Sequence, residues 1–314
     1  MPISLRSDGI DTPTKILVAL AFYACGSYQT LVGQSSSHSL SQPSVSRAIR
    51  QVTEVLNLPQ IFNKYVKFPG TQEDREEIKR GFYQKFGMSG VLGCIDGTHV
   101  AIVTPVDHEE RYFNRKGYHS LNVLVICDSD ARIMCVDSSN PGSTHDSAAW
   151  NNNPLSNTLN DIVRRTNEDF YLLGDAGFPL RRTMMTPILN AQENTPEALY
   201  TEMHMTTRNI VERCIGILKA RFRCLLVDRK LHYEPQVAAK IVNACCVLHN
   251  IALQCNLDFE NGEDQEALQQ EQNERERDAH IDARRISRVD HRNHQLQEGR
   301  TYQQTLVRRL WRAR

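Results

Sequence analysis

The spacing of apolar residues changes along the chain, and the first part has a helical period. A helix is predicted to begin at Pro13 and to contain the apolar run 16–24. A second helix is predicted between residues 41 and 58, because apolar residues recur there every three or four positions, at Val45, Ile49, Val52 and Leu56. We therefore expect residues 1–87 to form an all-helical subdomain, similar to a helix-turn-helix unit.

The middle of the chain begins with three predicted strands, at 91–103, 119–128 and 132–140, the last two joined by a hairpin turn. A short apolar run at 170–178 predicts a buried fourth strand. A short helix is predicted from 141–150, and longer helices are predicted at 206–226 and after Pro235. This order predicts an α/β domain over 88–256, with a mixed sheet flanked by helices.

Composition changes the picture at the end of the chain. Acidic residues dominate after 257 and arginines dominate after Asp282, so 257–314 is expected to be a charged tail, helical or disordered. Lys plus Arg and Asp plus Glu number 37 each, so net charge does not indicate a nucleic-acid partner. The longest apolar run is far too short to span a membrane, and no basic leader indicates a signal peptide. No membrane partner is predicted.

The nine cysteines form no CxxC pair, which favours free and mostly buried thiols. Cys245, Cys246 and His249 lie at helical spacing, and a zinc site is one interpretation of them. No second pair of zinc ligands accompanies them, so a buried apolar helix is the favoured interpretation.

Three acidic residues lie where strands end or where a helix faces a strand: Asp96, Asp175 and Glu212. A carboxylate beside a buried run needs a partner for its charge, and a metal ion is one such partner. Mg²⁺ or Mn²⁺ prefers oxygen ligands of this kind and supports phosphodiester cleavage. For an isolated strand-end Asp, however, a turn or cap role is the better interpretation, and Glu212 could equally pair with Arg208 one helical turn earlier. Asp146 is a fourth candidate, either as a metal ligand or in orienting His145 and the nucleic-acid strand.

Several blocks along the chain resemble the signature blocks of PIF/Harbinger-type transposases and of the nucleases derived from them. They are IDGTHV, NRKGYHSLN, PGSTHDS, LLGDAGFPL, RNIVERCIGILKARFRCL and ACCVLHNIAL, in the order expected, between about residues 91 and 253. The resemblance implies a DDE-type endonuclease with a ribonuclease H-like fold. By position in these blocks, Asp96, Asp175 and Glu212 are the implied catalytic acids. A divalent metal cation, Mg²⁺ or Mn²⁺, is the implied cofactor, held by the same three acids and Asp146.

The resemblance also bears on partners. It implies DNA as the substrate and a Myb/SANT-like DNA-binding protein as a partner. It also implies a location in the nucleus and the cytoplasm, and self-association into a homo-oligomer is possible. The chain begins nearer to the first helical block than such proteins do, so we expect a shortened N-terminus.

Two hypotheses follow for the function of the protein. One is a metal-dependent endonuclease, domesticated from a transposase and lacking full transposition. The other is a DNA-bound or chromatin adaptor in which catalysis is dispensable.

Candidate DNA contacts come from three places in the sequence. Residues 41–52 are similar to the second helix of a helix-turn-helix, which would present Ser44, Arg47 and Gln51 to DNA, although a helix that simply packs on the core fits equally well. Basic residues beside the acids and on the hairpin approach are further candidates for phosphate contacts: Arg115, Lys116, Arg208, Lys219 and Arg223. For any one residue beside the acids, a solvated surface position is the simpler interpretation, but their clustering there favours phosphate contacts.

Overall fold

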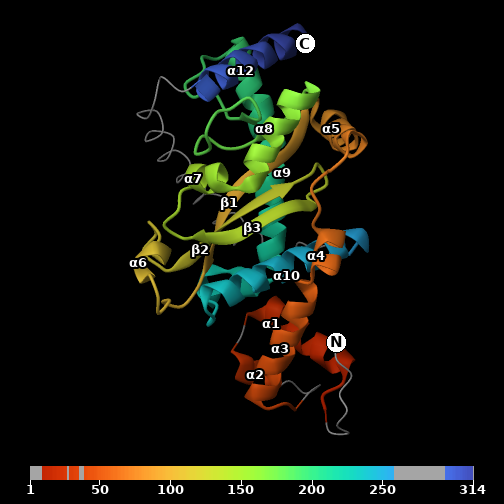
Figure 1. The fold of residues 1–314 in the computed structure, drawn as a ribbon, viewed down its shortest axis with the longest axis vertical. Helices are drawn as coiled ribbons and strands as arrows, with labels where there is room; N and C mark the ends of the chain where they lie inside the picture. The colour runs from red at the N-terminus through yellow and green to blue at the C-terminus, as the bar shows by residue number, and fades with distance from the viewer. Residues whose placement is uncertain (1–8, 27, 35–38, 258–293, 314) are drawn as a thin grey trace.

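The structure, a computed structural model, describes residues 9–26, 28–34, 39–257 and 294–313. A five-stranded mixed sheet lies at its centre (Figure 1). The strands are β1 (Val91–Ala101), β2 (Ser120–Cys127), β3 (Ile133–Pro141), β4 (Tyr171–Leu173) and β5 (Met184–Met185), in the spatial order β3-β2-β1-β4-β5. The chain is therefore mixed α/β, as the sequence predicted.

Strand β1 is the centre of this sheet. It pairs antiparallel with β2 and parallel with β4, while β2 pairs antiparallel with β3 and β4 pairs parallel with β5. Every residue of β2 is buried, as expected for a strand that is covered on both faces. Because side chains alternate along β1, Cys94 joins the core under α9 and Ile95 joins the core under α7 and α8.

Helices cover both faces of the sheet (Figure 1). The first five are α1 (Thr12–Cys25), α2 (Gln29–Gly33), α3 (Gln42–Leu56), α4 (Pro59–Tyr65) and α5 (Gln72–Phe86). The others are α6 (Glu109–Tyr112), α7 (Asp146–Asn152), α8 (Pro154–Thr166), α9 (Pro196–Arg221), α10 (Pro235–Gln254) and α12 (His294–Arg312), with single 3₁₀ turns at Arg223–Leu225 and Val227–Arg229. Proline in the first turn of six of them fits the missing backbone N–H at that position, namely α1, α3, α4, α8, α9 and α10.

The N-terminal helices share their core with the rest of the chain. Helix α3 buries Val45, Ala48 and Ile49 and contacts α1, α2 and α10, and α4 also contacts α10. Helix α5 contacts β1 and α9 instead. These contacts join the first helices to the sheet domain through α10, so they do not by themselves set residues 1–87 apart as a separate subdomain.

Helix α10 is the apolar helix that contains Cys245, Cys246 and His249. By length and composition alone it could cross a membrane, yet it contacts α3, α4, α9 and β3, as a core helix does. Nε2 of His249 is 3.0 Å from the carbonyl oxygen of Ala131, and both cysteines are fully buried. All nine cysteines are free, and six of them are buried, so the predicted free thiols are confirmed.

Helix α12 lies against the N-terminal part of α9, at the end of the molecule opposite α1–α3 (Figure 1). It buries Leu306 and Val307, and Nε2 of Gln303 donates to the carbonyl oxygen of Thr186 at 2.7 Å. Tyr302 stacks under the guanidinium of Arg182, 3.5 Å from the ring centre. Residues 294–312 thus form a helix, one of the two forms predicted for the charged tail, and this helix packs on the core; residues 258–293 lie outside the described residues.

Candidate functional site

Asp96 lies near the middle of β1 and is only 6% exposed. Side chains alternate along the strand, so Asp96 shares the face of Cys94 and points toward α9. Its Oδ1 accepts a hydrogen bond from the backbone N–H of Gly97 at 3.0 Å. Burial makes the charge of this carboxylate costly, so its neighbours on α9 matter for how that charge is held.

Helix α9 places His204, Arg208 and Glu212 on one stripe, because these residues recur every four positions. Nη2 of Arg208 forms an ion pair with Oε1 of Glu212, and Nη1 lies 3.7 Å from Oδ1 of Asp96. The Arg208 side chain is 14% exposed and that of Glu212 is 7% exposed. The salt bridge that the spacing suggested for Glu212 is present, and it extends to the acid on β1.

Asp175 follows β4 after one glycine. Its Oδ1 accepts a hydrogen bond from the backbone N–H of Gly177 at 2.9 Å, which fixes the turn. Burial lowers the pKa of Arg208, but the charges of Asp96, Glu212 and Asp175 outweigh burial and raise that pKa above its ordinary value. The three predicted acids therefore all act on one guanidinium, although they come from a strand, a loop and a helix.

Asp146 has different neighbours. It begins α7, and its Oδ1 accepts a hydrogen bond from Nδ2 of Asn122 on β2 at 2.7 Å. A Cβ atom at Gly97 would lie 2.2 Å from the same oxygen, so Asp146 lies on the face of β1 opposite Asp96. Glycine at 97 makes room for this carboxylate. The structure thus groups Asp146 with Asn122 and Gly97 on the α7 face, apart from the Arg208 contacts.

The three acids supply the hard oxygen atoms that Mg²⁺ and Mn²⁺ prefer. Within the described residues, no three acidic, histidine or cysteine side chains are arranged so that they could hold a metal ion as they stand. The guanidinium of Arg208 lies among these carboxylates instead, and its Nη1 is buried without a hydrogen-bond partner. The donor chemistry fits a divalent ion, and the arrangement around Arg208 would have to open for one.

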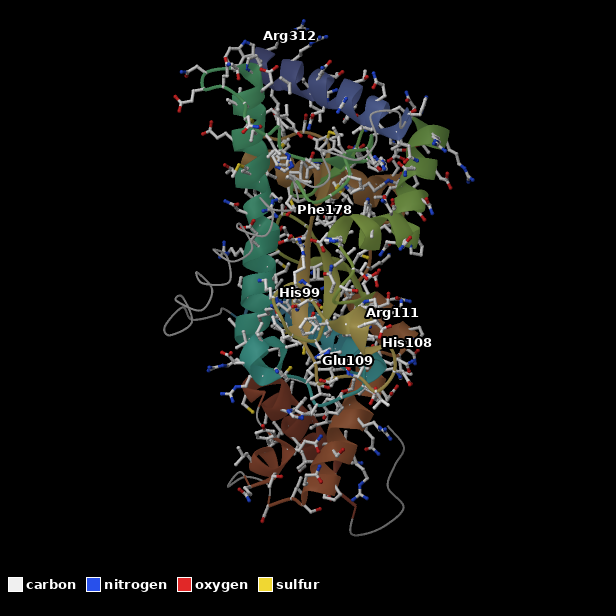
Figure 2. The ribbon with its side chains drawn as sticks, turned by 90° about the vertical axis from the view of Figure 1, so that its left-hand side faces the viewer. His99, His108, Glu109, Arg111, Phe178 and Arg312 are labelled. Carbon is white, nitrogen blue, oxygen red and sulfur yellow. The ribbon has the colours of Figure 1, made fainter. Side chains whose placement is uncertain are left out.

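Two residues predicted to contact phosphate lie inside the protein. Lys219 is 2% exposed and its Nζ donates to the carbonyl oxygen of His99 at 3.1 Å, while Arg208 pairs with the acids. Figure 2 shows His99 beside α9, with Arg111 of the α6 region on its other side. The contact of Arg208 and Lys219 with DNA stays a prediction, and in this arrangement both charges are directed at groups of the protein itself.

The other predicted DNA contacts differ in exposure. Arg115, Lys116 and Arg223 are exposed, as is Arg47 on α3. Ser44 and Gln51 on α3 are half-buried, and Oγ of Ser44 accepts a hydrogen bond from Nη2 of Arg47 at 3.2 Å. The exposed residues are distributed over α3, the loop before β2 and the 3₁₀ turn after α9, and their contact with DNA stays a prediction.

Sequence reasoning missed three residues that shape the site. Asn122 fixes Asp146, Gly97 makes room for it, and His204 lies one turn before Arg208 with its Nε2 3.1 Å from the carbonyl oxygen of Met185. Burial lowers the pKa of His204 to about 3, and the nearby charge of Arg208 acts in the same direction. Asn122, a polar residue within the apolar run of β2, was the one feature of the sequence that could have indicated these residues.

The buried acids Asp96 and Glu212 thus lie on a central strand and on a long helix, and the half-buried Asp175 lies on the loop after the neighbouring parallel strand. The DDE superfamily endonuclease family matches residues 95–250, a range that contains all four acids. The chain belongs to the DDE superfamily endonucleases, and its five-stranded mixed sheet is consistent with their fold.

Among the relatives, a Homo sapiens protein named "Putative nuclease HARBI1" is 39% identical over 254 residues, which cover 81% of this chain and 70% of the human protein. The Xenopus laevis protein of the same name is 37% identical over 81% of this chain and 71% of its own length. The Arabidopsis thaliana protein named Antagonist of Like Heterochromatin Protein 1 is 22% identical over 81% of this chain and 65% of its own length. No solved structure matches. The resemblance to Harbinger transposase-derived nucleases is confirmed.

Proposed function

We propose that this chain is a metal-dependent endonuclease that hydrolyses DNA phosphodiester bonds. The observation that carries the proposal is that Asp96, Asp175 and Glu212 all act on the guanidinium of Arg208, inside the region that matches the DDE endonucleases. The strand order β3-β2-β1-β4-β5, with the first three strands antiparallel, supports a ribonuclease H-like arrangement of these acids.

In the proposed site, carboxylate oxygens of Asp96, Asp175 and Glu212 would hold Mg²⁺ or Mn²⁺. When bound, the metal supplies Lewis-acid stabilisation of the phosphate and lowers the pKa of the attacking water. The backbone of Asp96 lies in the centre of the sheet and that of Glu212 in α9, while their carboxylates would have to turn from Arg208 to reach a metal ion. Asp146, held by Asn122, is proposed to support the nucleic-acid strand or a second ion from the α7 face.

The exposed basic side chains are proposed to contact DNA phosphates, which would make binding weaken as salt rises. Arg47, with Ser44 and Gln51, would do this from α3, and Arg115, Lys116 and Arg223 would do it nearer to the sheet. A domesticated role without full transposition, a Myb/SANT-like partner, a nuclear and cytoplasmic location and self-association remain part of this proposal as expectations of the family resemblance.

The test is nicking of supercoiled plasmid by the purified full chain with Mg²⁺ or Mn²⁺. Asp96→Asn should reduce the rate by about a thousandfold or more, because a ligand to the metal contributes several kcal/mol in the transition state. Asp130→Asn is the matched control, because Asp130 is exposed in the turn between β2 and β3 and pairs with Lys85 at the surface. We expect the control to keep the wild-type rate. Absence of metal-dependent nicking by the wild type, or equal nicking by Asp96→Asn, would overturn the proposal.

A second candidate is a chromatin-associated adaptor in which catalysis is dispensable. It is favoured by the similarity to the Arabidopsis thaliana protein, whose name refers to antagonism of a heterochromatin protein. The variant with Asp96, Asp175 and Glu212 all changed to the amides separates the two functions in cells that lack the protein. Full rescue by this variant supports the adaptor, and loss of rescue supports the nuclease.

A further inference from the structure

A pocket of about 460 Å³ lies between α8, the loop that joins β4 to β5, and α12. Three arginines line it, Arg164 of α8 and Arg181 and Arg182 of the loop, and α12 supplies the opposite wall. Gly299 brings α12 close to the loop, because a Cβ atom there would lie 2.9 Å from the backbone nitrogen of Arg181. The volume is within the range of ligand pockets, about 300–1,000 Å³.

Arg182 is engaged by the protein itself. Its Nη2 donates to Oδ1 of Asp169 at 3.0 Å, its Nη1 donates to the carbonyl oxygen of Phe170 at 3.1 Å, and its guanidinium lies over the ring of Tyr302. Nη1 of Arg309 donates to Oδ2 of Asp169 at 3.0 Å, and the hydroxyl of Tyr302 donates to Oδ1. Asp169 is therefore occupied by three partners, which anchor α12 against the loop.

Arg181 has no comparable acid beside it. Its side chain is half-buried, and its Nη1 donates to the carbonyl oxygen of the preceding Leu180 at 3.1 Å. Burial lowers the pKa of Arg181, and no carboxylate among the described residues raises it again. A guanidinium that has lost part of its hydration without gaining a carboxylate is costly to the fold, so this charge suits an anion that comes from outside.

Arg164 lines the same pocket from the last turn of α8, where it is exposed. Among the described residues that line the pocket, Glu298 is the one acid, and its Oε1 lies 3.3 Å from Nδ1 of His294 on the same helix. Glu298 is exposed, so water screens its charge. The pocket thus presents two guanidinium groups, of Arg164 and Arg181, that Asp169 does not neutralise.

A phosphate group fits this chemistry. The planar fork of a guanidinium matches the oxygens of a phosphate and can donate two hydrogen bonds to it. Positive charge also continues along α12, because Arg308 and Arg312 follow Thr301 and Thr305 at helical spacing and are exposed. A row of arginines that leads out of a pocket suits a chain of phosphates better than a single small anion.

The loop of Arg181 also leads to one of the predicted catalytic acids, because Asp175 lies near its start. Along the molecule, Phe178 of this loop lies between the end that carries Arg312 and His99 of β1 (Figure 2). The arginine pocket and the acid are therefore connected by one short stretch of chain.

We propose that this pocket binds a phosphate of the DNA backbone and that α12 continues the contact along the strand. Arg164 and Arg181 hold one phosphate in the pocket, and Arg308 and Arg312 face neighbouring phosphates. The identity of the ligand as DNA rests on the proposed function. The inference adds a binding surface at the end of the molecule opposite α1–α3 (Figure 1).

The test measures binding of the full chain to a fluorescent DNA duplex, in chelator and over a series of salt concentrations. The double variant Arg164→Gln, Arg181→Gln should bind about five- to tenfold more weakly at about 0.1 M salt. Its slope of log affinity against log salt should be smaller by about 0.9, the loss of one phosphate contact. Arg165→Gln is the matched control, because Arg165 is exposed beside Arg164 and does not line the pocket; its affinity should change less than about twofold.

Thermal melting without DNA verifies the fold and separates a ligand site from a structural role. Arg181→Gln should melt at the wild-type temperature or above it, because it removes a half-buried charge that has no carboxylate beside it. Lower melting of Arg181→Gln together with an unchanged salt slope in the double variant would show that Arg181 serves the fold, and would overturn the proposal.

Equal salt slopes in the wild type and the double variant, with a wild type that nicks plasmid, would overturn the phosphate pocket and leave the nuclease proposal standing. A polyglutamate peptide that binds the wild type but not the double variant, with DNA binding unchanged, would overturn it in favour of an acidic protein partner. The predicted loss of slope in a protein that never nicks plasmid would support the pocket and overturn the nuclease.

Discussion

Two buried arginines face carboxylates in different ways. Arg75 on α5 meets one acid, Glu168, and all three of its nitrogen atoms donate: Nε and Nη2 to Glu168 at 2.8 and 2.6 Å, and Nη1 to the carbonyl oxygen of Gly70 at 2.9 Å. Arg208 on α9 meets three acids and leaves Nη1 without a hydrogen bond. In the Arg75–Glu168 pair one positive charge meets one negative charge and every guanidinium nitrogen donates a hydrogen bond, as expected for a pair that stabilises the fold. The Arg208 group brings carboxylates from three different elements to one guanidinium and leaves one of its donors without a hydrogen bond.

The largest expected effect on stability comes from breaking the Arg75–Glu168 pair. Glu168→Gln should destabilise the protein by about 3–5 kcal/mol, because it leaves the charge of Arg75 buried without its partner. Glu54→Gln is the matched control: Glu54 pairs with Lys240 at 2.9 Å on the surface, and its loss should cost less than about 1 kcal/mol. Urea unfolding of the two variants measures the difference. Equal losses would show that burial does not set the strength of these pairs.

A medium effect concerns His204, the buried base one turn before Arg208. Its pKa is about 3 in the folded protein because burial keeps it neutral, whereas it titrates near 6.5 when unfolded. The unfolded chain therefore binds a proton that the folded chain refuses as pH falls below 6.5. This group should cost about 2 kcal/mol of stability between pH 7 and pH 5.

The matched experiment compares unfolding at pH 7 and pH 5 in the wild type and in His204→Gln. The variant should lose about 2 kcal/mol less over this interval than the wild type does. An identical loss in both proteins would mean that His204 is protonated, or exposed to water, in the fold at pH 5.

The smallest expected effect is at Asp175, where the substitution should not lower the stability of the protein. Asp175→Asn is the same kind of change as Glu168→Gln, yet Asp175 is half-buried and is one of three carboxylates whose charges act on Arg208. In the absence of metal we expect Asp175→Asn to be as stable as the wild type or more stable by up to about 1 kcal/mol, as is common at functional sites. Thermal melting in chelator measures this. A loss as large as that of Glu168→Gln would remove the distinction between the two regions.

The sequence predicted the parts of the fold that have a strong local pattern. The three long strands and the helix of Glu212 were found because apolar residues repeat along them. Strand β5 has two residues, and only its pairing with β4 defines it, so no local pattern could reveal it. Helix α8 was also missed, although Asn153 and Pro154 are a recognisable helix start.

The candidate site shows the same limit. The pairing of Arg208 with Glu212 could be predicted because the two residues lie four positions apart on one helix. Its approach to Asp96, which is distant in the sequence, depends on how α9 crosses β1, and no spacing encodes that. The placing of Asp146 on the other face of β1 likewise follows from the β1–β2 register and from Asn122.

The central claim is that Asp96, Asp175 and Glu212 form the metal site of a nuclease. An anomalous-difference map from crystals of the full chain soaked in Mn²⁺ tests it most directly. We predict a peak about 2 Å from carboxylate oxygens of these three residues. A protein that cuts DNA with Mn²⁺ but shows its Mn²⁺ peak elsewhere would contradict the claim.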